Sequence, residues 1–241
     1  MKTLLLVLPL IAFSSCAKKL VDLALKKAGA FDKTTILQPL EYNDKEIVFL
    51  NMVHLATREY YDDVSHKIDS LQKDGYFVFY EGLYLKKSER IISENDTITY
   101  LKFRKVMGID PLMEYSKIKP FSDYVDKYNL IDQPDYTDLG ITSKNSKAVD
   151  LPMTVLISEL EKEKGAVELT SCDFDQKLGS GSYTCIKADS DVRKYLLENI
   201  VINKRNENIV QHIKQSDTKK IVIVYGKNHY DGIKEMLQGV N

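Results

Sequence analysis

Three polar residues, His54, Glu81 and His229, each follow a run of apolar residues typical of a buried strand. The three runs lie at residues 47–53, 76–80 and 221–225. If these strands are neighbours and parallel, their carboxyl ends meet at one edge of a sheet, where α/β folds bind ligands. Two neutral imidazoles and a carboxylate suit a catalytic divalent metal with positions left open for water and substrate. Spacing alone leaves a shared site open, because polar residues commonly end strands.

The two histidine motifs have the same internal spacing. Asn51 lies three positions before His54, and Gly226 lies three positions before His229. Asn and Gly tolerate positive φ better than other residues, so we expect both strands to turn sharply at corresponding points. The other two histidines, at positions 66 and 212, lie among polar neighbours on predicted helices, where we expect solvent contact only.

The order of the predicted elements indicates an α/β protein. Strands are predicted at residues 34–40, 46–52, 76–80 and 221–225, and helices at residues 59–73, 97–107, 151–164, 189–215 and 230–237. Residues 132–145 resemble a loop, and polar residues at 203–208 indicate a break in the long fourth helix. The predicted fold is therefore an α/β domain with a helical insertion before its last strand.

Length and composition fit one globular domain. The chain has 241 residues, of which 44% are hydrophobic and 29% charged, and its formal net charge is -1. A near-neutral chain without a basic cluster argues against a nucleic-acid partner. No low-complexity linker divides the sequence, so we expect a single domain over residues 30–241.

The N-terminus is typical of an exported protein. A lysine at position 2 precedes an apolar run at residues 3–13, too short to span a bilayer. The run ends in Ala12-Phe13-Ser14-Ser15-Cys16, which resembles a bacterial lipobox. The resemblance implies a signal peptide at residues 1–15, an acyl anchor in the lipid bilayer on Cys16, and a tether with a short helix at residues 16–29. An ordinary secretory peptide is the alternative. Ala17 is not the Asp typical of inner-membrane retention, which favours the outer membrane within the cell envelope.

Two cysteines remain if Cys16 carries lipid. Cys172 and Cys185 form an even pair in an oxidising compartment, which predicts a disulfide. The polar segment between them is expected to be a hairpin or an exposed loop. Two free thiols are the alternative.

The motifs together resemble the TraB/PrgY/GumN family and the related Tiki metalloproteases. The resemblance rests on the segments Asn51-Met52-Val53-His54, Tyr80-Glu81-Gly82 and Tyr225-Gly226-Lys227-Asn228-His229, on the helix at 101–111 and on Arg205-Asn206. It covers residues 47–237 and implies a mixed central sheet of the erythromycin esterase-like and ChaN-like kind. Asn51 stands where the family usually has Gly; Asn can adopt the same turn, and a drifted, inactive site is the alternative.

The resemblance implies an envelope-anchored hydrolase, a metal-dependent peptidase that acts on a peptide or protein substrate. His54, Glu81 and His229 would bind zinc, manganese or cobalt, with Glu81 as third ligand or general base. Arg205 would stabilise an oxyanion or position a carboxylate. From the residues alone, Arg205 is more typical of a solvated helix face. Two other functions stay open: a metal-free, esterase-like hydrolase, and a non-catalytic lipoprotein that binds a peptide signal.

Overall fold

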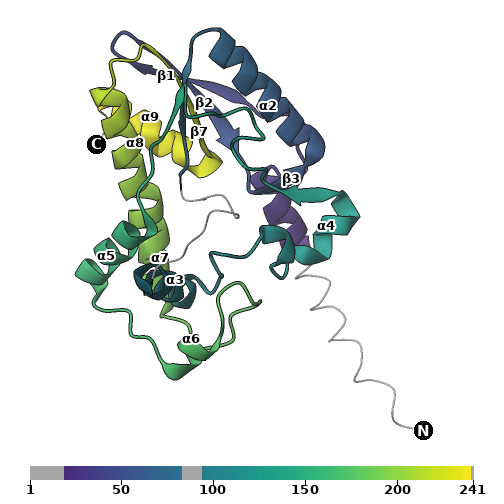
Figure 1. Cartoon of the computed structure of the whole chain (residues 1–241), viewed down its shortest axis with the longest axis vertical. Coiled ribbons are helices and arrows are strands. Elements are labelled where there is room, and N and C mark those ends of the chain that lie inside the picture. The colour runs from purple at the N-terminus through teal and green to yellow at the C-terminus, as the bar shows by residue number, and fades with distance from the viewer. Residues whose placement is uncertain (1–18, 83–93, 240–241) are drawn as a thin grey trace.

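The computed structural model describes residues 19–82 and 94–239, and Figure 1 shows their arrangement. The expected signal peptide and the expected lipidation site Cys16 lie outside these residues. A helix at residues 19–28 begins the described part, within the segment expected to hold a tether and a short helix. Among the helices that the structure describes, none is long and apolar enough to cross a membrane.

A mixed sheet of five strands forms the centre of the α/β fold. In their order across the sheet, the strands are β1 (Leu37–Tyr42), β2 (Lys45–Met52), β7 (Lys220–Gly226), β4 (Phe77–Tyr80) and β6 (Ser146–Ala148). The pairs β2–β7, β7–β4 and β4–β6 are parallel, and β1 pairs antiparallel with β2 at one edge. A separate antiparallel pair joins β3 (Leu55–Thr57) to β5 (Leu130–Asp132). The prediction of an α/β fold with a mixed sheet is therefore confirmed.

Helices cover both faces of the sheet, as Figure 1 shows. The helices that pack on it are α2 (Arg58–Lys73), α8 (Arg205–Gln215) and α9 (Tyr230–Gln238). Alternate residues of β7 face the two layers: Val222 and Val224 share a buried cluster with α2, and Ile221 and Ile223 share another with α8 and α9. Because β7 is buried on both faces, its sequence is an unbroken apolar run.

The ends of α2 follow from its sequence. The Thr57 hydroxyl accepts a hydrogen bond from the backbone N–H of Tyr60 at 3.3 Å and caps the first turn. Beyond Lys73, Gly75 adopts a φ of 86°, which lets the chain reverse into β4. The helix predicted at residues 59–73 is confirmed.

The described part of the chain between β4 and α8 lies mostly to one side of the sheet in Figure 1, and only its strand β6 joins the sheet. Its helices are α3 (Glu94–Met107), η2 (Tyr115–Lys117), α4 (Ser122–Tyr128), α5 (Met153–Lys164), α6 (Ser171–Asp175), α7 (Ser190–Tyr195) and η3 (Leu196–Lys204), a π-helix. The prediction of a helical insertion was incomplete, because the strands β5 and β6 also lie in this segment. The predicted break at residues 203–208 is wrong: the chain stays helical there and changes from π to α winding at Arg205.

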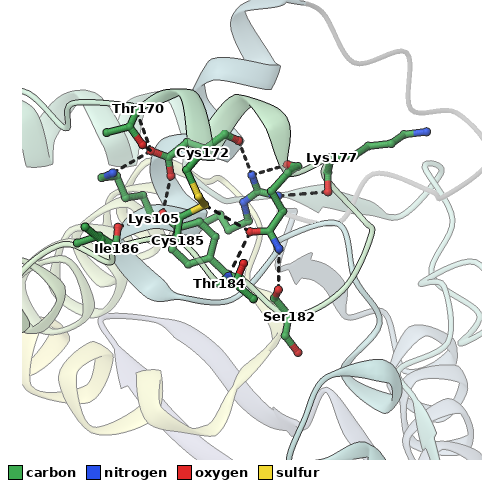
Figure 2. The surroundings of a disulfide bond; sticks show 12 residues. Lys105, Thr170, Cys172, Lys177, Ser182, Thr184, Cys185 and Ile186 are labelled. Carbon is green, nitrogen blue, oxygen red and sulfur yellow. Dashed lines mark hydrogen bonds and ion pairs between the residues drawn. A yellow bond between two sulfur atoms is a disulfide. The ribbon is translucent and has the colours of Figure 1, made fainter.

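A disulfide joins Cys172 to Cys185, and Figure 2 shows its surroundings. The segment between them, expected to be a hairpin or an exposed loop, begins as the end of α6 and continues from residue 176 as a largely exposed loop. It is held against α3 by Arg104, which donates to the backbone carbonyls of Asp173 at 2.8 Å and Gln176 at 2.7 Å. The covalent link and these hydrogen bonds hold the loop to the helical part of the protein.

A buried carboxylate anchors the same loop. Asp173 is fully buried and accepts hydrogen bonds from Lys105 at 2.8 Å, from the Thr170 backbone at 2.8 Å and from the Tyr183 hydroxyl. Burial acts to raise the pKa of Asp173, but the hydrogen bonds from Lys105, Tyr183 and Thr170 outweigh it and hold the pKa at about 2. Lys105, part of the helix singled out in the sequence, therefore has a structural partner.

Replacing both cysteines, Cys172→Ser and Cys185→Ser, is expected to lower the free energy of unfolding by about 3 kcal/mol, because the unfolded chain regains the entropy of a short loop. Urea unfolding of the double variant and the wild type would measure the difference. Dithiothreitol should lower the wild-type midpoint towards that of the variant and leave the variant unchanged. A wild-type midpoint that does not respond to the reductant would contradict the prediction.

Candidate functional site

The sheet topology brings the three predicted residues to one edge. β7 lies between β2 and β4, and all three strands run in the same direction. His54 follows β2 by two residues, Glu81 follows β4 directly, and His229 ends the short helix η4 (Lys227–His229) after β7. All three line one hollow of about 400 Å³, together with Arg205 and Gly226. We call this the strand-end hollow.

Glu81 is the most enclosed residue of the group, with 3% of its surface exposed. Its Oε1 atom accepts a hydrogen bond from Nη2 of Arg205 at 2.5 Å, while its Oε2 atom is buried without a hydrogen-bond partner. Burial acts to raise the pKa of Glu81, but the charge of Arg205 and the nearby imidazoles outweigh it and hold the pKa at about 2. The carboxylate is therefore charged at neutral pH and keeps one oxygen available.

Gly226 leaves a small space between Glu81 and His229. A Cβ atom added to Gly226 would lie 3.8 Å from Oε2 of Glu81 and 3.7 Å from Cδ2 of His229. The unpartnered oxygen and the imidazole edge therefore border the same space. Gly226 has a φ of −55°, so lack of a side chain, and not positive φ, is what this position uses.

The expectation of positive φ at both motif positions is wrong. Among the described residues, the non-glycine residues with positive φ are Asn43 and Asn129 and do not include Asn51. Asn51 pairs with Tyr225, and Gly226 pairs with Met52, so the two motifs are offset by one residue in the sheet. Equal spacing along the sequence therefore does not give equivalent positions here.

Arg205 connects Glu81 to a second carboxylate. Its Nε and Nη2 atoms donate to the two oxygens of Asp150, each at 2.8 Å, in the bidentate geometry that arginine forms with carboxylates. Its guanidinium also lies 5.2 Å from the centre of the Tyr225 ring. Two carboxylates around one guanidinium leave this buried cluster with a net charge of about −1, which favours a cation in the hollow.

His229 is fixed by a neighbour on α8. Its Nδ1 atom lies 2.7 Å from Oδ1 of Asn206, so we assign the proton to Nδ1 and the lone pair to Nε2. Burial and the charge of Arg205 lower the pKa of His229 to about 4. The imidazole is therefore neutral over the usual working range of pH, as a metal ligand must be.

His54 is held in a comparable way by different residues. Its Nδ1 atom lies 3.1 Å from Oε1 of Gln133, and its ring stacks on Tyr115 with 5.1 Å between ring centres. An amide oxygen thus bonds Nδ1 of both histidines. Metal-binding histidines commonly have their second nitrogen bonded in this way, which fixes the tautomer and the ring orientation.

The donor set fits a divalent metal in chemical character. It combines an unpartnered carboxylate oxygen, two imidazoles fixed at Nδ1 and a net negative surrounding. In the ranges 19–82 and 94–239, however, no three His, Cys, Asp or Glu side chains gather closely enough to hold one ion. Shared coordination would therefore require movement of the side chains.

No family model, curated protein or solved structure matches this chain. The resemblance to the TraB/PrgY/GumN family therefore rests on the motifs described above.

Sequence reasoning missed Asp150, Gln133 and Tyr115. Asp150 follows β6, whose sequence Ser-Lys-Ala has no apolar pattern, and Gln133 lies in the segment predicted to be a loop. The signal that could have identified Asp150 and Gln133 is a polar residue soon after a strand. That signal can be used only where the strand itself has been recognised in the sequence. Arg205 and Asn206 are both buried, so the solvated helix face that their residue types alone suggest is wrong.

Proposed function

We propose that this protein is a hydrolase, a divalent-metal-dependent peptidase that cleaves a peptide or protein substrate at the strand-end hollow. The observation that carries the proposal is the buried, unpartnered Oε2 of Glu81 facing His229 across Gly226. The motif resemblance supports the same function and, more finely, an erythromycin esterase-like or ChaN-like version of the α/β fold. We also propose the acyl anchor on Cys16 and an outer-membrane location.

Each protein residue has a separate task in this proposal. Arg205 holds Oε1 of Glu81 and so directs Oε2 into the hollow, while Asp150 holds Arg205. Asn206 and Gln133 hold Nδ1 of the histidines, so that Nε2 of His54 and of His229 can bind zinc, manganese or cobalt. A metal bound there supplies a water of lowered pKa and polarises the substrate carbonyl.

The pKa values favour ligand roles over general-base roles. An efficient general base has a pKa close to the working pH, whereas the pKa of Glu81 is about 2 and that of His229 about 4. Both groups bind protons weakly at neutral pH and keep their lone pairs for a cation. This argues against Glu81 and His229 as the general base of a metal-free, esterase-like hydrolase.

The metal content of protein purified without chelator tests the proposal. We expect about one equivalent of metal in the wild type and its loss in His54→Ala and His229→Ala, because each variant removes one ligand. His66→Ala is the matched control, since His66 is an exposed residue of α2 and should leave the metal content unchanged.

A metal-free wild type whose melting temperature does not respond to added zinc, manganese or cobalt would rule out the metal. The metal-free, esterase-like hydrolase and the non-catalytic peptide-binding lipoprotein would then remain. Both are compatible with the described ranges, in which no three potential ligands are arranged to share an ion.

A further inference from the structure

A second cavity, of about 190 Å³, lies beside the strand-end hollow. His54, Glu81 and Arg205 line both, so the proposed reaction centre lies where the two meet. We call the second one the helical cavity. Apart from those three residues, its lining is mainly apolar and includes Tyr100, Phe103, Met107, Met153, Leu197 and Val201.

The walls of the helical cavity belong to a packed helical core. Its lining residues come from α3, α5, η3 and the connection after α3. The same three helices share a buried cluster that contains Val106, Leu156 and Leu196. Because the walls from α3, α5 and η3 pack on this cluster, that side of the cavity is a built feature of the fold.

The second acidic residue that lines the helical cavity already has hydrogen-bond and ion-pair partners within the protein. Asp110 accepts hydrogen bonds from the backbone N–H groups of Gly179 at 2.7 Å and Leu112 at 3.0 Å. It also pairs with Arg104 at 3.4 Å, and it is 3% exposed. A guest in the cavity would therefore meet apolar walls beyond the charged mouth.

One wall of the helical cavity runs along η3 to the start of α8. Residues four apart lie on the same face of a helix. Leu197, Val201 and Arg205 follow this spacing, and all three line the cavity. The apolar wall therefore continues directly into the guanidinium that holds Glu81.

We propose that the helical cavity is a specificity subsite that receives a large apolar side chain, such as Leu, Met or Phe, beside the bond to be cut. This inference rests on the proposed peptidase function and names its substrate class. A charged side chain would lose its hydration among mainly apolar walls, and a small one would leave empty space. Preference for Leu over Ala or Asp at that position should be about tenfold or more.

Direct binding of a peptide series tests this subsite without requiring cleavage. The chain contains no tryptophan, so the fluorescence of a blocked Gly-Gly-X-Trp-Gly peptide reports the peptide alone. We would measure its binding with Leu, Met, Phe, Ala or Asp at X, and follow cleavage of the same peptides with zinc, manganese or cobalt present. The wild type should bind the Leu, Met and Phe peptides at least about tenfold more tightly than the Ala and Asp peptides.

Two variants with a matched control place the preference in the cavity. Ile109→Phe, at a position that lines the helical cavity and not the strand-end hollow, fills part of the cavity and should reduce the preference for Leu, Met and Phe to about twofold or less. Phe103→Leu enlarges the cavity and should favour Phe at X. Val155→Phe is the control, because Val155 lies on α5, is 38% exposed and does not line the cavity. Circular dichroism would confirm that each variant folds.

The outcomes separate the subsite from the reaction. Binding with the expected preference but no cleavage would refute the peptidase and support the subsite. Cleavage with no preference at X, or a preference that Ile109→Phe leaves unchanged, would refute the subsite and support the peptidase. Absence of both binding and cleavage would refute both.

Discussion

Glu81→Gln is expected to reduce peptide hydrolysis by about 1000-fold or more while the protein remains folded. Glutamine keeps the shape of the side chain but loses the charge that would bind a cation, and metal catalysis is worth several kcal/mol of the reaction barrier. The fold should persist because Arg205 keeps both hydrogen bonds to Asp150. Turnover of a library of quenched fluorescent peptides, with zinc, manganese or cobalt added separately, would measure the loss.

The same substitution at a second ion pair provides the control. Glu161 pairs with Lys102 at 2.6 Å on the helical side of the protein and lines neither cavity. Glu161→Gln should therefore leave turnover within about twofold of the wild type. Full activity in Glu81→Gln would contradict the proposed reaction centre. A wild type that binds peptides and cleaves none would support the binding-protein alternative.

The strands that are clearest in the sequence are those buried on both faces of the sheet. β2, β4 and β7 lie inside the sheet, so their sequences carry unbroken apolar runs. β6 has a neighbour on one side alone, and its three residues are exposed or half-buried. The pattern therefore fails at this three-residue edge strand, and the position of Asp150 beside it could not be predicted.

The charged part of the site was harder to predict than its histidines. Arg205 lies 124 residues after Glu81 and 55 residues after Asp150 in the chain. Nothing local distinguishes an arginine with two buried partners from one on a solvated helix face. The motif resemblance singled out Arg205, whereas residue types and periodicity favoured the solvated face.

Arg205→Met is expected to lower the free energy of unfolding by about 3–5 kcal/mol, the largest effect on stability that we predict. The variant leaves Glu81 and Asp150 buried without a cation, and an uncompensated buried charge is more costly than the loss of the pair as a whole. Urea unfolding at about pH 7, with a chelator present to exclude metal effects, would measure the change. Lys102→Met, which breaks a partly exposed pair, is the control and should cost about 1 kcal/mol or less.

The loss of stability in Arg205→Met should also shrink as the pH falls. In the wild type, the pKa of Glu81 is lowered from its usual 4.5 to about 2, so its stabilising contribution is complete above 4.5 and is lost as the pH falls through 2. Without Arg205, burial should raise the pKa of Glu81 above 4.5. As the pH falls, protonation of Glu81 then removes its unpaired buried charge and restores part of the stability of the variant. The difference between variant and wild type should therefore be smaller at about pH 4 than at about pH 7.

Adding Glu81→Gln to Arg205→Met should recover part of the lost stability at neutral pH, because one of the two unpaired charges is gone. A difference that is constant with pH, together with no recovery in the double variant, would show that Arg205 stabilises the fold by packing and not by its charge.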